Sequence, residues 1–120
     1  MKQFLTGIFV GLLASTLVVM AQHAASEKGV EPQAIADNGR VEMVRWVLKP
    51  GERTVVHRHD VDHIGIVIHG STIRYFEADG TSKESDERTG GAEFVPTTGK
   101  AHSFENVGKE TFEAVSIHLK

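Results

Sequence analysis

Three of the seven histidines in this chain lie within seven residues of one another. His57 and His59 form a His-x-His pair, and His63 follows four positions later. Side chains two residues apart in an extended segment point to the same face, so this pair can present both imidazoles together. Neutral imidazole nitrogens bind divalent transition metals. The spacing therefore predicts a metal site.

A fourth histidine, His102, completes the predicted ligand set. It follows a loop over residues 96–100 and starts an expected strand. The acidic turn at residues 60–62 can return His63 toward the His57–His59 pair. A lone histidine on a strand usually makes only a hydrogen bond. Burying four imidazoles without a metal would instead leave several ring nitrogens unpaired, at about 1–3 kcal/mol each.

Composition limits the classes of protein that this chain can be. It has 120 residues, enough for one domain, and a net charge of −3 from 13 basic and 16 acidic residues. A protein whose main role is to bind nucleic-acid phosphates should be basic, so the net charge disfavours that class. The chain has no cysteine. Disulfides, thiolate zinc sites, cysteine nucleophiles and lipid-modified lipoproteins are therefore excluded as well.

The N-terminus has the pattern of a secretory signal peptide. Lys2 precedes an apolar stretch over residues 4–21, and the segment 19–21 suits cleavage after Ala21. An uncleaved membrane anchor is the alternative, although 18 residues is short for a spanning helix. We expect a signal-peptide helix at 1–21, a mobile lead-in at 22–31 and a barrel domain at 32–120. Cleavage would leave 99 of the 120 residues, in the periplasm or secreted.

The remainder reads as short strands separated by turns. Asn38-Gly39, Pro50-Gly51 and Asp79-Gly80 are turn signals. No stretch after residue 40 has helical periodicity over three turns. Seven or eight short strands predict an all-β sandwich or small barrel. The expected strands cover residues 41–48, 64–68, 72–77, 81–89, 92–95, a segment from 102, and 111–119, with 81–89 on a sheet edge.

Two segments resemble the paired motifs of the cupin family. Gly51-x5-His57-x-His59-x3-His63-x6-Gly70 is similar to the first motif. Gly90-x5-Pro96-x2-Gly99-x2-His102-x3-Asn106 is similar to the second, although two residues rather than one separate proline and glycine. The resemblance covers nearly the whole mature chain and extends to small single-domain bacterial cupins, including those named for β-alanine degradation.

The resemblance implies a jelly-roll barrel (double-stranded β-helix) with one metal ion. By position, His57, His59, His63 and His102 would be the ligands, and Asn106 would be structural. The family's ligand glutamate is His63 here, so the ligand set would be neutral and would keep the full charge of the ion. It would also lack a carboxylate that serves as a base in some cupins. Copper, nickel, zinc, iron and manganese all accept imidazole ligands.

These features support more than one function. An exported metal-dependent oxygenase, lyase or isomerase acting on a small organic substrate is one hypothesis. A metal- or ligand-binding or sensing module without turnover is the alternative, and a metal-free jelly roll is the third. Fold alone does not decide among them. After cleavage, neither a membrane nor a nucleic acid is an expected partner.

Other residues carry weaker expectations. Phe104, two residues from His102, is the candidate pocket wall. Asp60 and Asp62 either support the ligand imidazoles or form a polar turn, which is the favoured interpretation. His69 is expected to be structural, and the pattern leaves open whether His118 points inward. Apolar outer positions on the expected strand 64–68 would need cover, which predicts a homodimer; these positions are Ile64, Ile66 and Ile68.

Overall fold

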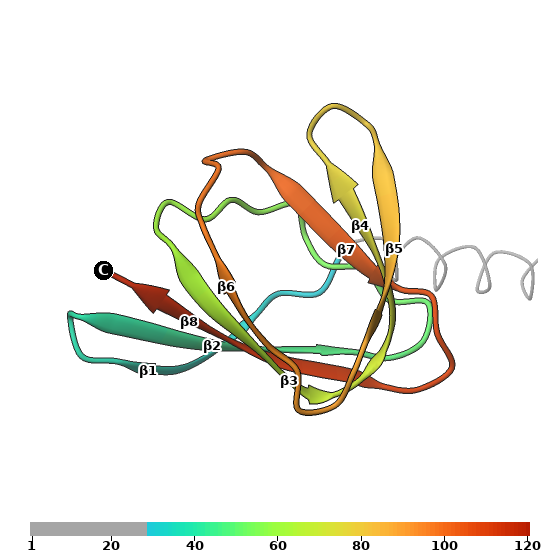
Figure 1. Ribbon diagram of the computed structural model, residues 1–120, viewed down its shortest axis with the longest axis horizontal. Helices are drawn as coiled ribbons and strands as arrows, with labels where there is room; N and C mark the ends of the chain where they lie inside the picture. Colours follow the sequence, from blue (N-terminus) through green and yellow to red (C-terminus); the bar gives the residue numbers. More distant parts are fainter. Residues whose placement is uncertain (1–28) are drawn as a thin grey trace, which may run out of the picture.

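The computed structural model describes residues 29–120 as eight strands (Figure 1). The predicted signal peptide, and the predicted lead-in up to residue 28, lie outside the described residues. Within 29–120, no helix has the length and apolar character needed to cross a membrane. The strands are β1 (Gln33–Asp37), β2 (Val41–Leu48), β3 (His63–His69), β4 (Ser71–Glu77), β5 (Ser82–Glu87), β6 (Ala92–Val95), β7 (His102–Asn106) and β8 (Phe112–Leu119).

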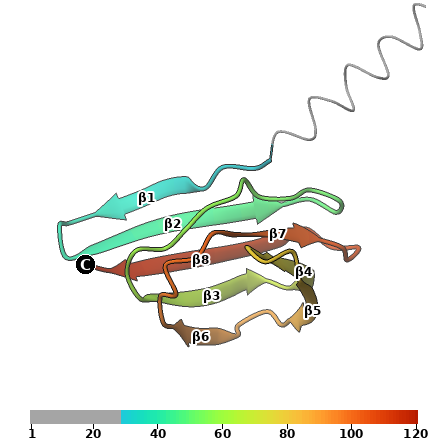
Figure 2. The same cartoon turned by 90° about the horizontal axis from the view of Figure 1, so that it is seen from above.

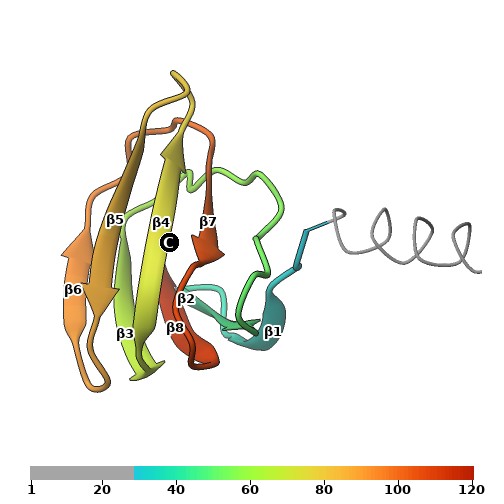
Figure 3. The same ribbon diagram turned by 90° about the vertical axis from the view of Figure 1, so that its right-hand side faces the viewer.

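The strands form two sheets that enclose the interior between them. One sheet has five strands in the order β1-β2-β8-β3-β6, and the other has three in the order β5-β4-β7. Every pairing between these strands is antiparallel. Figures 2 and 3 show the two layers from above and from the side. The predicted all-β double-stranded β-helix architecture is confirmed.

Most strand predictions agree with the structure. The predicted segments 41–48 and 92–95 coincide with β2 and β6, and polar β5 lies at a sheet edge as expected. Strand β1 was not predicted. All five of its residues are exposed and it pairs only with β2, through a register irregularity between Ala34 and Ala36. An edge strand that buries nothing has no hydrophobic alternation to reveal it.

The His-x-His pair lies on an extended segment rather than within a regular strand. Residues 52–62 pair through isolated bridges, of which His57↔His102 is one. The alternation of side chains still holds, because His57 and His59 are half-buried while Arg58 between them is exposed. The turn before this segment depends on Gly51, whose φ of 86° lies in the left-handed region that favours glycine.

The apolar core lies between the two sheets, and two of its residues, Trp46 and Phe104, contact the His57 ring. Inward-facing residues alternate along β2, and aromatic rings from β7 and β8 pack against them. Trp46 and Phe104 meet edge to face with their ring centroids 5.4 Å apart. The buried core residues are Val44, Trp46, Leu48, Ile73, Phe104 and Phe112. Burying each larger side chain contributes about 1.5–3 kcal/mol, and this packing gives the site a rigid floor.

Asn106, at the end of β7, is a fully buried polar residue. Its amide nitrogen donates to the carbonyl of Leu48 at 2.9 Å and to that of Glu110 at 2.7 Å. Its Oδ1 accepts from the Ser71 hydroxyl at 2.7 Å and from the backbone N–H of Gly108 at 3.0 Å. These four hydrogen bonds tie together the ends of β2, β4, β7 and β8.

Replacement of Asn106 by alanine should be strongly destabilising. Asn106→Ala leaves several buried polar groups unpaired, so we expect the free energy of unfolding to fall by about 3 kcal/mol. Chemical denaturation monitored by the fluorescence of Trp46 measures this change. Asn38→Ala is the matched control, because Asn38 is exposed and water replaces its hydrogen bonds. Equal losses for the two variants would contradict the structural role of Asn106.

Candidate metal centre

Two histidines 45 positions apart are placed together by the backbone. The N–H of His57 donates to the carbonyl of His102 at 2.8 Å, and the reciprocal bond has the same length. A doubly hydrogen-bonded antiparallel pair has both side chains on the same face. The two Nε2 atoms consequently lie 3.0 Å apart inside the barrel.

The orientation of the His57 ring is determined by its neighbours. Its Nδ1 lies 2.9 Å from the carbonyl oxygen of Val55, which can only accept a hydrogen bond. The hydrogen of the neutral ring is therefore on Nδ1, and the lone pair of Nε2 points toward His102. Buried Trp46 packs against the other side of the ring, with centroids 4.7 Å apart.

His59 completes a group of three. Each of His57, His59 and His102 offers a ring nitrogen, and these atoms all lie within 4.8 Å of one another. His63 stands beside this group, with its ring 4.4 Å from that of His59. It is only 8% exposed, and its buried Nδ1 has no hydrogen-bond partner. The structure thus gathers three of the four predicted ligands, with the fourth adjacent.

A fifth imidazole, His118, joins the cluster from β8. Its Nε2 lies 3.2 Å from Nδ1 of His59, and its side chain is 14% exposed. The sequence left its direction open because the other face of β8 is more apolar. That apolar face points outward, whereas Ala114, Ser116 and His118 face inward opposite Trp46, Val44 and Glu42 of β2. Small inward side chains on β8 leave room for a cavity, a feature that strand alternation alone cannot reveal.

Burial keeps the imidazoles neutral. Loss of hydration is the main cause that lowers the pKa of His59 to about 3 and that of His63 to about 4, and repulsion from neighbouring imidazoles adds to it. Burial likewise lowers the pKa values of His57 and His102. A metal ligand must be the neutral imidazole. The four predicted ligands, His57, His59, His63 and His102, are therefore held in their ligand form.

The cluster has the donor set and geometry that a metal ion requires. Two nitrogens bound about 2.1 Å from one ion at a right angle are separated by about 3 Å, which matches the His57–His102 pair. The lone pair of His57 Nε2 faces the same point, and His63, whose ring lies 4.4 Å from that of His59, has a buried Nδ1 without a hydrogen-bond partner. Buried polar atoms without partners are rare in folded proteins. The three-histidine group could hold a metal ion.

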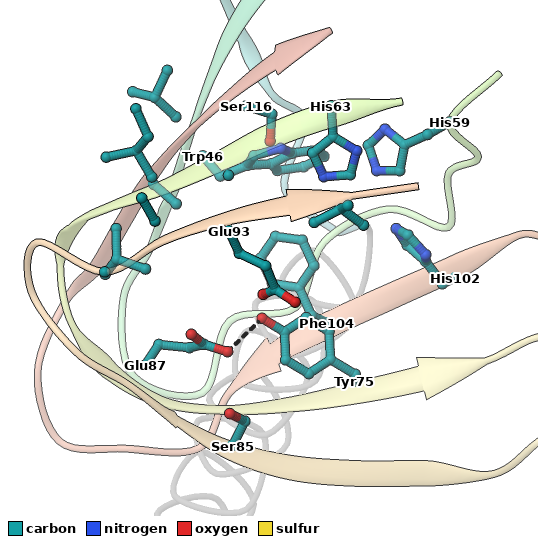
Figure 4. A pocket seen from close by; sticks show the side chains of 18 of the residues that line it. Trp46, His59, His63, Tyr75, Ser85, Glu87, Glu93, His102, Phe104 and Ser116 are labelled. Atoms are coloured by element: carbon teal, nitrogen blue, oxygen red, sulfur yellow. Dashed lines mark hydrogen bonds between the residues drawn. The ribbon is translucent and has the colours of Figure 1, made fainter. Parts of the chain in front are cut away.

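A cavity of about 560 Å³ extends from this cluster into the barrel. His59, His63 and His102 lie at one end (Figure 4). Phe104, the residue expected to be a pocket wall, lines the cavity and also belongs to the core. The volume is in the range of small-molecule sites in proteins, 300–1,000 Å³. The imidazoles therefore face a space large enough for an organic ligand.

The part of the cavity near β5 and β6 is polar. The Tyr75 hydroxyl donates to Glu87 at 2.9 Å (Figure 4). Burial, together with Glu87 and Glu93, raises the pKa of Tyr75, so this hydroxyl stays protonated. Lys83 and Ser85 also line this region. The cavity thus combines aromatic walls with hydrogen-bonding groups of both kinds.

The remaining candidate residues lie outside the three-histidine group. The Asp62 carboxylate accepts a hydrogen bond from the backbone of Thr97 at 2.8 Å and so joins two loops at the cavity mouth. Asp60 is exposed in the same turn. The Nδ1 atoms of His57 and His59 contact Val55 and His118 instead of these acids. His69 is exposed at the far end of β3 and contacts the Thr111 carbonyl at 2.6 Å.

The sequence matches no protein-family model and no curated protein. Its fold matches solved structures. A cupin domain from Bordetella pertussis is 28% identical, with a TM-score of 0.69 over 77% of this chain and 94% of that chain. A Klebsiella pneumoniae protein with a double-stranded β-helix domain is 21% identical, with a TM-score of 0.62 and coverage of 78% and 79%. This chain therefore has the double-stranded β-helix fold of a cupin domain.

A third solved structure supports the same assignment. A cupin 2 conserved barrel domain protein from Salinispora arenicola is 20% identical, with a TM-score of 0.58 over 79% of each chain. The three-histidine group combines residues of both cupin-like motifs. His57 and His59 of the first motif lie on the extended segment before β3, and His102 of the second motif begins β7.

The lowered pKa values predict how the stability of the metal-free protein depends on pH. An unfolded histidine titrates near pH 6.5, whereas His63 and His59 titrate near 4 and 3 in the folded chain. Below pH 6.5 the unfolded chain therefore binds protons that the folded chain does not. We expect the contribution of these histidines to the free energy of unfolding to be fully present above pH 6.5 and to decrease as the pH falls toward 4.

Denaturation in a chelating buffer between pH 8 and pH 4 measures this effect. His63→Gln removes one of the neutral buried imidazoles, so its free energy of unfolding should decline less steeply over the same range. Identical slopes for the parent and the variant would show that burial of His63 does not contribute.

Proposed function

We propose that this cupin binds one divalent transition metal through its histidine cluster and holds a small organic molecule beside the metal. The observation that carries the proposal is the group of three neutral imidazoles whose ring nitrogens lie within 4.8 Å of one another, two of which, His59 and His102, line a cavity of about 560 Å³. His63, with its unpartnered buried Nδ1, is the fourth ligand in this proposal. A bound ion would supply a Lewis acid and open positions for the organic molecule.

The cavity suggests what that molecule looks like. An oxygen-bearing end would face the imidazoles, and an aromatic or apolar middle would contact Trp46 and Phe104. The other end would meet Tyr75 and Glu87, which suits hydroxyl or amino groups that donate hydrogen bonds. Oxygenase, lyase or isomerase chemistry on such a compound is the enzymatic form of this proposal.

A non-catalytic binding or sensing role is the second candidate. The observation that favours it is that the immediate cluster consists of imidazoles, with no carboxylate in the group of three to act as a base. Metal-replete protein that consumes oxygen or converts a compound of the kind described above would establish the enzyme. Tight binding of metal and compound without turnover would establish the binding role.

The metal site is tested by elemental analysis of the mature protein. We propose that the chain is exported and cleaved after Ala21, so the protein should be purified from the periplasm and its N-terminal residue determined. About one transition-metal ion per chain is expected. His57→Ala combined with His59→Ala should lose it, because two of the three clustered nitrogens disappear.

The matched control is His69→Ala, which removes an exposed histidine far from the cluster. Its metal content should equal that of the parent. If the parent holds no more metal than the double variant, even after reconstitution, the histidines are not a working metal site.

We also propose that two copies of the chain pair through the outer face of the larger sheet. Ile64 of β3 lies opposite Phe94 of β6 and Ile117 of β8 on this face. Phe94 is 56% exposed and Ile68 is 47% exposed. Exposed apolar positions of this kind are typical of a protein interface. A second copy fits because a small domain buries a limited share of its own surface.

Light scattering coupled to size exclusion tests the pairing. The mature protein should have a mass of roughly 22 kDa, twice that of 99 average residues. Phe94→Lys places a charge on the proposed interface and should shift the protein toward roughly 11 kDa. A parent protein that elutes as a monomer at all concentrations would contradict the proposal.

A further inference from the structure

We propose that Glu42 and His118 form a positioning pair that orients the candidate metal ligand His59 and selects its tautomer. The proposal rests on the metal site proposed above, but the hydrogen bonds that carry it exist in the protein without metal. None of the sequence motifs includes Glu42, and His118 is outside the predicted ligand set.

The three side chains form a continuous hydrogen-bonded series. Oε1 of Glu42 lies 3.1 Å from Nδ1 of His118, and Nε2 of His118 lies 3.2 Å from Nδ1 of His59. A carboxylate only accepts hydrogen bonds, so Nδ1 of His118 is the donor. The proposal assigns Nε2 of His118 as the acceptor and Nδ1–H of His59 as the donor of the second hydrogen bond. The lone pair of His59 is then on Nε2.

This assignment matches the orientation of the neighbouring ligand. His57 also carries its hydrogen on Nδ1, because that atom faces the carbonyl of Val55. Each ring therefore uses an outer acceptor to hold Nδ1–H and leaves Nε2 free for a metal. Such outer partners orient ligand imidazoles and raise their basicity. For His57 the acceptor is a neutral carbonyl, whereas for His59 the series ends in a carboxylate.

The pair is held on rigid parts of the fold. Glu42 lies opposite His118 in the β2–β8 register, and His118 lies opposite His63 in the β8–β3 register. Residues directly opposite each other share a face, so three adjacent strands present these side chains side by side. A backbone hydrogen bond from Leu119 to the carbonyl of Asp62, at 2.9 Å, joins the end of β8 to the segment before β3.

The pair also brings a charge to the site. The group of three contains imidazoles alone. Glu42 brings a negative charge to the cluster through His118 without entering the group of three. Glu42 is 40% exposed, so its carboxylate keeps its hydration. His118 is 14% exposed and connects this carboxylate to His59 through its two ring nitrogens. Within residues 29–120, no further carboxylate forms a hydrogen bond with an imidazole of the cluster.

The metal-free protein provides the first test. Long-range ¹H–¹⁵N correlation spectra at pH 8 report which ring nitrogen of each histidine carries hydrogen. The parent should show His59 and His118 as Nδ1–H tautomers. Glu42→Gln should shift the His118 ring, and His118→Phe should convert His59 to a mixture of tautomers. His59 found as the Nε2–H tautomer in the parent would overturn the proposal.

Metal affinity provides the second test. Zn²⁺ binding, measured by competition with a chelator, should weaken by about 10–100-fold in His118→Phe and in Glu42→Gln. X-ray absorption should count the same number of imidazole ligands in the parent and in both variants, since His118 is not a ligand. Loss of one imidazole in His118→Phe, or unchanged affinity in Glu42→Gln, would overturn the positioning role.

Two control variants keep the test interpretable. His69→Phe makes the same chemical change at an exposed histidine on β3, and Glu113→Gln neutralises an acid on β8 that pairs instead with Arg45 at 3.2 Å. Both should keep the parent affinity. Because Glu42 is partly exposed, Glu42→Gln should fold even if His118→Phe does not. A parent that binds no Zn²⁺ yet shows the expected tautomers would refute the metal site and not the positioning pair.

Discussion

The reciprocal backbone hydrogen bonds between His57 and His102 are the constraint on which the candidate site depends. They join the irregular segment after β2 to the start of β7, which belongs to the smaller sheet. Because the bonds are paired, both imidazoles must lie on the same face, where their Nε2 atoms approach to 3.0 Å. The cluster forms where a loop closes onto a strand, and the rest of the barrel holds that contact in place.

The core and the cavity divide the interior between them. Trp46 belongs to both, because it packs against Phe104 on one side and against the His57 ring on the other. Apolar packing thereby restricts the position of an imidazole whose hydrogen bond to Val55 fixes its tautomer. Burial also lowers the pKa values of the clustered histidines, so the environment that stabilises the fold keeps them in the form that binds metals.

Several features were predictable because they depend on local patterns. Turn dipeptides and alternating apolar residues predicted β2, β6 and the polar edge strand β5. The sequence predicted that four histidines come together, His57, His59, His63 and His102, and the structure brings three of them, His57, His59 and His102, into one group. Strand β1 was not predicted because an exposed edge strand has no buried face. The direction of His118 could not be predicted because it follows from the β3–β8 register, which depends on residues about 50 positions apart.

The sequence by itself determined the class of fold and the chemistry available to the site. Without cysteine, and with histidines at cupin-like spacing, imidazole was the expected metal ligand. Only the tertiary structure decided which imidazoles meet, which nitrogen each one turns inward, and that Glu42 reaches the cluster through His118. The physical reason is that spacing constrains direction along one strand, whereas distances between strands are set by hydrogen-bond register and by the packing of the two sheets.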